Sequence, residues 1–169
     1  MPLTGDSDYI REDFRMLSNL WIKRFLDLSK LVSTWSKDPS TKVGAVIIDP
    51  ETKTIVSTGY NGFPRNIEDS EERLNNRELK YKFVVHAEMN AIMNALYNNR
   101  SVKNCILFVH GLPCCSDCAK AIIQSGIKEI VTDSKASSKW GDSCKVAVEM
   151  FREADVKITN VLDAEYLTN

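Results

Sequence analysis

The chain has 169 residues, of which 43% are hydrophobic and 27% are charged, and this length predicts one domain with a buried core rather than two. Its 22 Lys and Arg against 23 Asp and Glu give a net charge of -1, which excludes the overall basic field that holds a long nucleic acid. Because residues 1–13 are polar and acidic and no run of about eighteen apolar residues occurs, we expect no secretory leader and no membrane span, and a cytoplasmic location.

The first predicted elements are a helix and a hairpin. Apolar residues at helical spacing predict an amphipathic helix that ends before Pro39, and they are Trp21, Phe25, Leu28, Val32 and Trp35. Two β-branched runs follow, over residues 43–48 and 54–59, with the turn-rich segment DPETK between them. This pattern is typical of a β-hairpin.

The later elements alternate between helices and strands. They are predicted as helices over about 86–97, 115–125 and 142–154, and as strands over 105–109, 128–133 and 156–161. We therefore expect an α/β fold, a mixed five-stranded sheet with helices on both faces. No repeat or linker divides the chain, so residues 1–169 are expected to form one domain with a core over about 20–160. Residues 61–85 have weak periodicity and are expected to form a long loop that is either functional or flexible.

The segment VVHAEMNAI places His86 and Glu88 two residues apart. On a regular helix these positions point roughly 200° apart, so the side chains can converge only where a helix begins. There His86 can occupy the cap and Glu88 the first turn, where the helix dipole favours a carboxylate. The alternative is a buried core histidine and a capping glutamate.

The segment GLPCCSDCAKA contains Cys114, Cys115 and Cys118. In a reducing compartment, clustered thiols are typical of metal or redox sites rather than of disulfides. The sequence places them where a strand gives way to a helix, and the helix start favours thiolates. Cys105 and Cys144 stand apart and are expected to be buried without such a role.

One histidine and a C-x-x-C pair form a suitable ligand set for catalytic zinc, which leaves one position for water. Glu88 is then a carboxylate near the metal that can take a proton from that water. The alternative is a structural zinc site, which a fourth protein ligand normally closes. The local candidates for that ligand are His110 and Cys114.

These motifs resemble the zinc-dependent cytidine/deoxycytidylate deaminases, whose signature is H-x-E followed by P-C-x-x-C. The resemblance extends to four segments in the family's order: DPSTKVGAVI, STGYNGFPR, VVHAEMNAI and CAKAIIQSGIKEIV. It covers most of residues 20–131, and the chain after Asp133 resembles the family only loosely. It implies a deaminase domain with a three-layer, cytidine-deaminase-like fold.

The chain departs from the family's pattern because Cys114 stands between Pro113 and the C-x-x-C pair. Counting back from CAKA, the spacing selects Cys115 and Cys118 as ligands and leaves Cys114 as a neighbouring thiol. The competing pair, Cys114 and Cys118, can share one helix face, but it would displace the strand-to-helix turn by one residue.

The resemblance implies hydrolytic deamination of dCMP to dUMP and ammonia, which supplies thymidylate synthesis. The expected mechanism uses one Zn²⁺ per subunit, a zinc-bound hydroxide and Glu88 as the proton shuttle. The backbone at Ala87 is expected to read the base and Asn61 to bind the sugar, unless Asn61 only begins an Asn-Gly turn. Candidates for contacting the phosphate are Ser40, Thr41, Lys42 and Arg65.

The resemblance also implies a homo-oligomer, often a hexamer, activated by dCTP and inhibited by dTTP with Mg²⁺ accompanying the triphosphate. The residues expected to bind the effector are Gly59, Tyr60, Asn61, Gly62 and Arg65. Further basic side chains in the segment 61–85 include Arg73, Arg77, Lys80 and Lys82, although its mixed charges are also typical of a solvated loop. The alternatives are a deaminase that acts on dCTP, a deaminase that acts on another base carrier, and a non-enzymatic zinc-stabilised module. No nucleic-acid or membrane partner is expected.

Overall fold

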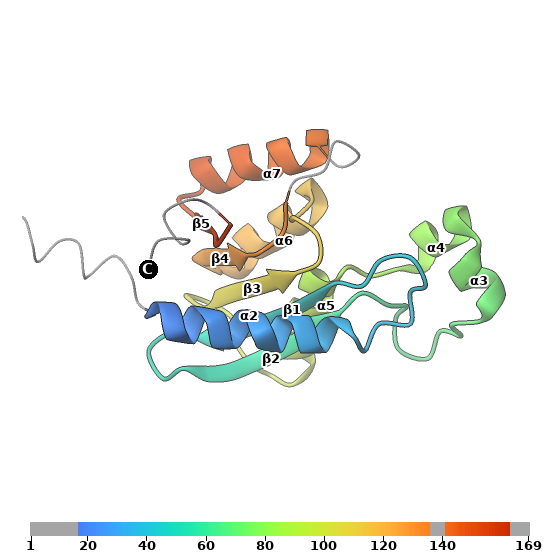
Figure 1. Cartoon of the computed structure of the whole chain (residues 1–169), viewed down its shortest axis with the longest axis horizontal. Helices are drawn as coiled ribbons and strands as arrows, with labels where there is room; N and C mark the ends of the chain where they lie inside the picture. Colours follow the sequence, from blue (N-terminus) through green and yellow to red (C-terminus); the bar gives the residue numbers. More distant parts are fainter. Residues whose placement is uncertain (1–16, 136–140, 163–169) are drawn as a thin grey trace, which may run out of the picture.

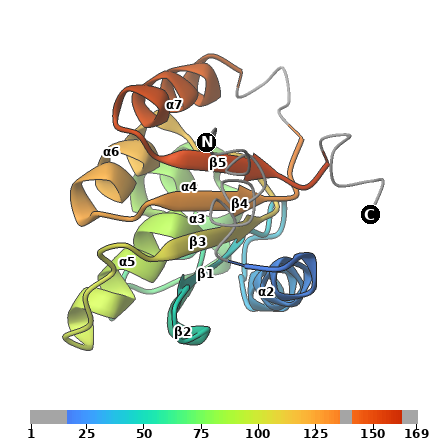
Figure 2. The same ribbon diagram turned by 90° about the vertical axis from the view of Figure 1, so that its left-hand side faces the viewer.

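The computed structural model describes residues 17–135 and 141–162, so the acidic segment 1–13 lies outside the described residues. Five strands form one sheet in the order β2-β1-β3-β4-β5. Figures 1 and 2 show helices on both faces of this sheet. The predicted α/β architecture with a mixed five-stranded sheet is confirmed. No helix of the described part of the chain has the length and apolar content that crossing a membrane requires.

The first helix, α2 (Asn19–Ser33), begins at Ser18, whose side chain accepts a hydrogen bond from the backbone of Trp21. Its buried stripe includes the predicted residues Phe25 and Val32. Trp35 was predicted to continue this stripe, and that was wrong: its side chain is 50% exposed. The reason is that the helix ends at Ser33, so helical spacing no longer decides which way Trp35 points.

The predicted hairpin is present as β1 (Gly44–Asp49) and β2 (Thr54–Tyr60), which pair antiparallel. The third strand, β3 (Ile106–His110), runs antiparallel to β1. The last two strands, β4 (Glu129–Thr132) and β5 (Lys157–Asn160), extend the sheet in parallel with β3. The sheet is therefore mixed: the strands of its antiparallel part, β1, β2 and β3, precede the parallel strands β4 and β5 in the sequence.

Two hydrophobic layers lie on opposite faces of the sheet. One contains the helices α5 (Ala87–Tyr97), α6 (Ser116–Ser125) and α7 (Gly141–Glu153), and the other contains α2. Side chains of β1 alternate between them: Ala45 and Ile47 pack toward α5 and α6, whereas Val46 and Ile48 pack toward α2. All four are fully buried, which is why this strand reads as a continuous apolar run.

The prediction of a loop over residues 61–85 was wrong, because two short helices form there. They are α3 (Glu71–Asn75), capped by Ser70, and α4 (Arg77–Phe83), capped by Asn76. No residue of α3 is buried, so its sequence carries little apolar periodicity. In Figure 1 both helices project away from the sheet, at the end where α5 begins.

Gly59 lies where β2 passes against α5, and its replacement tests that packing. A Cβ at this position would lie 2.3 Å from the Ala91 nitrogen and 2.4 Å from the Ala87 oxygen, both backbone atoms. Because a helix backbone cannot move aside as a side chain does, we expect Gly59→Ala to lower the free energy of unfolding by about 1–3 kcal/mol. Urea denaturation measures this change.

Gly62→Ala is the matched control, since its Cβ would meet only the Tyr60 ring, at 3.7 Å or more. We expect its effect to stay within about 0.5 kcal/mol. Equal losses in the two variants would contradict the close approach of β2 to α5.

Candidate metal centre and substrate cavity

His86 and Glu88 stand at the start of α5, as the sequence predicted. His86 is the N-cap residue and has an extended backbone, with φ -66 and ψ 155. Glu88 lies in the first turn and is 4% exposed. A backbone bridge between Gly62 and Val85 fixes the chain just before the helix begins. The change from extended to helical backbone is what allows the two side chains to approach one region.

Cys115 and Cys118 stand at the start of α6. Cys115 is the N-cap residue, and its sulfur lies 3.5 Å from the backbone nitrogen of Cys118. The preceding turn contains Gly111, whose φ of +114 suits glycine and whose N–H donates to Ser134 Oγ at 3.1 Å. This turn sets the direction in which the C-x-x-C segment leaves the sheet.

The two helix starts bring three potential metal ligands together. His86 Nδ1 lies 3.4 Å from Cys115 Sγ and 3.5 Å from Cys118 Sγ, and all three atoms lie within 4.8 Å of one another. Zinc–ligand bonds of about 2.0–2.3 Å place the ligands of a tetrahedral ion roughly 3.5–3.8 Å apart. The donor set and its spacing therefore fit a zinc ion.

The two candidates for a fourth ligand do not join this group. His110 Nδ1 is hydrogen-bonded to Asp133 Oδ2 at 2.7 Å, and Cys114 Sγ donates to the Cys115 carbonyl at 3.4 Å. Within residues 17–135 and 141–162 the group thus has three protein ligands, which leaves a tetrahedral ion one position for water or substrate. Open coordination is typical of catalytic rather than structural zinc.

The protonation of the thiols favours Cys115 over Cys114 as a ligand. Hydrogen bonding to Cys118 and to His86 lowers the pKa of Cys115 and favours the thiolate, which is the form that binds metals. Burial raises the pKa of Cys114 well above that of an ordinary thiol, which keeps it neutral. The hydrogen bond with Cys115 and burial raise the pKa of Cys118, so the charges separate Cys115 from Cys114 only. The position of all three ligand atoms is what supports the register that the sequence selected.

The Glu88 carboxylate lies beside the group without belonging to it. Its Oε2 is 3.9 Å from Cys118 Sγ. Burial raises the pKa of Glu88, although its backbone hydrogen bond and the charge of His86 act in the opposite direction. A buried carboxyl in this position can hold a proton next to a metal-activated water.

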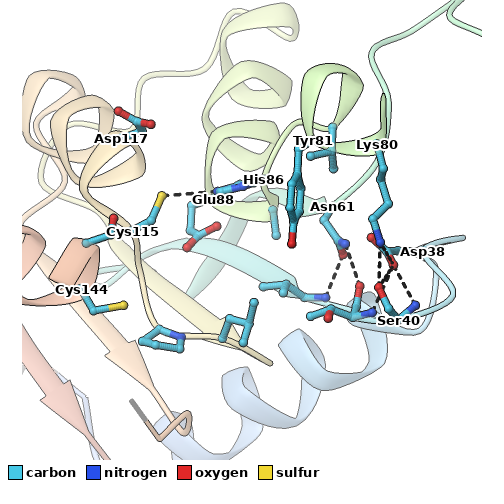
Figure 3. Close-up of a pocket in the computed structure, with 17 residues that line it drawn as sticks. Asp38, Ser40, Asn61, Lys80, Tyr81, His86, Glu88, Cys115, Asp117 and Cys144 are labelled. Carbon is cyan, nitrogen blue, oxygen red and sulfur yellow. Dashed lines mark hydrogen bonds and ion pairs between the residues drawn. The ribbon is translucent and has the colours of Figure 1, made fainter. Parts of the chain in front are cut away.

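These groups form one end of a cavity of about 260 Å³, shown in Figure 3. Asn61, Ala87 and Thr41 line the cavity, as expected of substrate contacts. Lys42 does not line it, because its Nζ donates to the carbonyl of Ser36 at 2.5 Å. Arg65 is also elsewhere: its guanidinium binds the Asn94 side chain and lies 4.4 Å from the Tyr97 ring centre. Lys42 and Arg65, two of the four predicted phosphate contacts, are thus not brought to the cavity.

Asn61 holds the loop that closes one side of the cavity. Its Oδ1 accepts from the Val43 N–H at 2.8 Å and its Nδ2 donates to the Thr41 carbonyl at 2.9 Å. Neither Asn61 nor Gly62 has a positive φ, so the pair does not form the type I′ turn that Asn-Gly favours. A contact with a sugar stays a prediction.

Several cavity residues were not predicted. Asp38, Tyr81, Asp117 and Ser143 line it, and Cys144, expected to be a bystander, is buried in its wall. Ser143 Oγ accepts from the N–H of Ser116 at 3.0 Å, so the start of α7 is joined to the start of α6. Tyr81 lies on α4, and the sequence signal for the start of this helix is Asn76 at the cap with Glu78 in the first turn.

A second cavity of about 110 Å³ adjoins the first. Three of the predicted effector residues line it, namely Tyr60, Asn61 and Gly62. Gly59 does not, because it is buried against α5, and Arg65 does not either. The two cavities share four wall residues: Asp38, Asn61, Lys80 and Val84.

Comparison with known proteins identifies relatives along most of the chain. Residues 19–134 match the family model described as the cytidine and deoxycytidylate deaminase zinc-binding region. A protein of Aliivibrio fischeri named as an uncharacterised deaminase is 42% identical over 142 residues, covering 82% of this chain and 92% of its own. Human deoxycytidylate deaminase is 42% identical over 128 residues, covering 73% of this chain and 68% of its own.

A solved structure has the same fold. The dCMP deaminase of cyanophage S-TIM5, in complex with dCMP and dUMP, superposes with a TM-score of 0.69 over 85% of this chain and 98% of its own, at 23% identity. This likeness confirms the expected cytidine-deaminase-like fold.

Proposed function

Since the chain belongs to the cytidine and deoxycytidylate deaminase family, we propose that it is an enzyme that hydrolyses dCMP to dUMP and ammonia. The observation that carries this proposal is the group of His86, Cys115 and Cys118 with Glu88 beside it, at one end of a cavity of about 260 Å³. A structural zinc site would not require a buried carboxylate next to an open coordination position.

In the proposed mechanism His86, Cys115 and Cys118 would hold a zinc ion. When bound, zinc activates a water molecule by lowering its pKa toward about 7. Glu88 takes a proton from this water as the oxygen attacks C4 of the pyrimidine. It donates that proton to N3, takes the second proton of the added hydroxyl and passes it to the exocyclic amine. The C4–N bond then breaks and ammonia leaves.

The surroundings of Glu88 suit this role. The side chain is 4% exposed, so bulk water has little access to the proton while it is being transferred. The cavity near it is lined by apolar side chains that fit the flat face of a pyrimidine, and these are Val43, Val84, Leu112 and Pro113. Ala87 lines the cavity at the helix start, and we propose that its backbone reads the base edge.

The proposal extends to regulation. The second cavity shares walls with the first, so a triphosphate bound there would contact residues that also line the substrate cavity. We propose activation by dCTP and inhibition by dTTP, with Mg²⁺ accompanying the triphosphate, in a homohexamer. A coupling of about 1–3 kcal/mol would change dCMP affinity about 5- to 150-fold. The proposed location is the cytoplasm, where dUMP supplies thymidylate synthesis.

The test is turnover by the purified protein of dCMP, dCTP, deoxycytidine, CMP and dAMP, with zinc measured on the same sample. We expect the highest kcat/KM for dCMP and about one zinc per subunit. Preference for dCTP would favour a different nucleotide deaminase, and stoichiometric zinc without turnover would favour a zinc-stabilised module.

Saturation curves for dCMP with and without dCTP or dTTP and Mg²⁺, alongside light scattering, test the regulation. A monomer with a hyperbolic curve that neither triphosphate moves would contradict it, while leaving the proposed reaction intact.

A further inference from the structure

The substrate cavity has two chemically different ends. Figure 3 shows His86, Glu88 and Cys115 on one side and Lys80, Asp38 and Ser40 on the other, with Asn61 and Tyr81 between them. A nucleotide has the same order of parts: a base, a sugar and a phosphate. If the base reacts at the metal end, its 5′ substituent extends toward Lys80.

Lys80 is the only lysine or arginine among the described residues that line this cavity. It lies on α4 and is 7% exposed. Its Nζ is 3.0 Å from Asp38 Oδ1 and 2.7 Å from Ser40 Oγ. An ammonium group has three N–H donors, and these two contacts use two of them. The third is available to an anionic ligand in the cavity.

The Asp38 carboxylate does not need Lys80 to complete its own hydrogen bonding. The same Oδ1 accepts from the Ser40 N–H at 2.9 Å, from Ser40 Oγ at 2.9 Å and from the Thr41 N–H at 3.1 Å. A carboxylate oxygen has two lone-pair sites, so three donors already exceed its capacity. Burying a further cation here costs desolvation free energy, so the position of Lys80 indicates a role other than completing the hydrogen bonding of Asp38.

Asp38 instead holds the Lys80 side chain in place. Burial alone would raise the pKa of Asp38, but the hydrogen bonds from Ser40, Lys80 and Thr41 lower it overall, so the carboxylate is ionised. The ionised Asp38 Oδ1 lies 3.0 Å from Lys80 Nζ and attracts it, which fixes the direction of the lysine side chain. The ammonium is therefore preorganised before any ligand arrives.

We propose that Lys80 selects nucleoside 5′-monophosphates over nucleosides by donating its third N–H to a phosphate oxygen, an inference that rests on the proposed deamination of dCMP. Asp38 is the positioning residue for this contact. Lys42, the cation that the sequence indicated for the phosphate, is turned toward Ser36 instead. The selection is thus made by a residue distant in the chain from the loop that it contacts.

Isothermal titration of the zinc-loaded protein with dUMP and with deoxyuridine tests this assignment. We expect Lys80→Met to weaken dUMP binding about 10- to 100-fold, the loss typical of a hydrogen bond to a charged group, and to leave deoxyuridine binding within about twofold. Since Lys80→Met leaves a buried carboxylate unpaired, the double variant Asp38→Asn, Lys80→Met removes both charges and should give the same selectivity loss.

Two further variants serve as controls for the lysine substitution. Lys145→Met changes an exposed lysine on α7 and should alter neither affinity. Lys42→Met tests the competing cation, and a selective loss of dUMP binding there but not at Lys80 overturns the proposal. Equal weakening of both ligands in the Lys80 variants also overturns it, because a lysine that only fixes α4 would not distinguish them.

Turnover of dCMP by the wild-type protein tests the proposed function separately. The wild-type protein could turn over dCMP while both Lys80 variants keep the wild-type ratio of dUMP to deoxyuridine affinity. That result would overturn the assignment of Lys80 and leave the proposed reaction intact.

Discussion

Glu88→Gln is expected to lower kcat for dCMP by about 10²–10⁴-fold, the contribution typical of a positioned general acid–base group. The amide has nearly the same size as the carboxylate and fits the same buried position in the first turn of α5. It cannot accept and return a proton. Because Glu88 does not belong to the group of potential metal ligands, the zinc content should stay near that of the wild-type protein.

The measurements for this variant are dUMP formation, zinc content and thermal unfolding on one preparation. Glu149→Gln, which makes the same change at an exposed position of α7, is the matched control and should retain wild-type turnover. Turnover by Glu88→Gln within tenfold of wild type would contradict the role of Glu88 as the proton shuttle, whereas loss of zinc would indicate that Glu88 is a ligand.

The second large effect is expected at the cysteines. Replacing a residue that only supports a metal ligand typically lowers metal affinity roughly 10- to 100-fold. Cys115→Ala and Cys118→Ala should each weaken zinc binding by more than this and should abolish turnover. The site has three protein ligands, so the loss of one leaves too few for tight zinc binding. Cys114→Ala should retain most of both properties, because burial keeps that thiol neutral and its sulfur contacts a backbone carbonyl instead.

Competition with a chromophoric chelator measures zinc affinity in all three variants, so Cys114→Ala serves as the control that makes the same change one residue away. If Cys114→Ala lost zinc and Cys115→Ala kept it, the C-x-x-C register would be wrong. If all three kept it, the ion would be held elsewhere.

Local spacing was sufficient to predict the main parts of the metal centre. A histidine and a glutamate two residues apart converge only at a helix start, and a C-x-x-C segment after a strand places its sulfurs at another helix start. The structure shows His86, Cys115 and Cys118 together, while their role as zinc ligands stays a prediction. The alternation of strands and helices likewise predicted the mixed sheet.

The other end of the cavity was decided by tertiary structure. Lys80 and Asp38 are 42 positions apart in the chain, and no periodicity relates them. Residues 61–85 lack a buried stripe, so the short helix that carries Lys80 left little apolar signal in the sequence. The direction of a flexible lysine side chain depends on the partner that it finds. Lys42 accordingly turns to a backbone carbonyl, whereas Lys80 reaches the cavity.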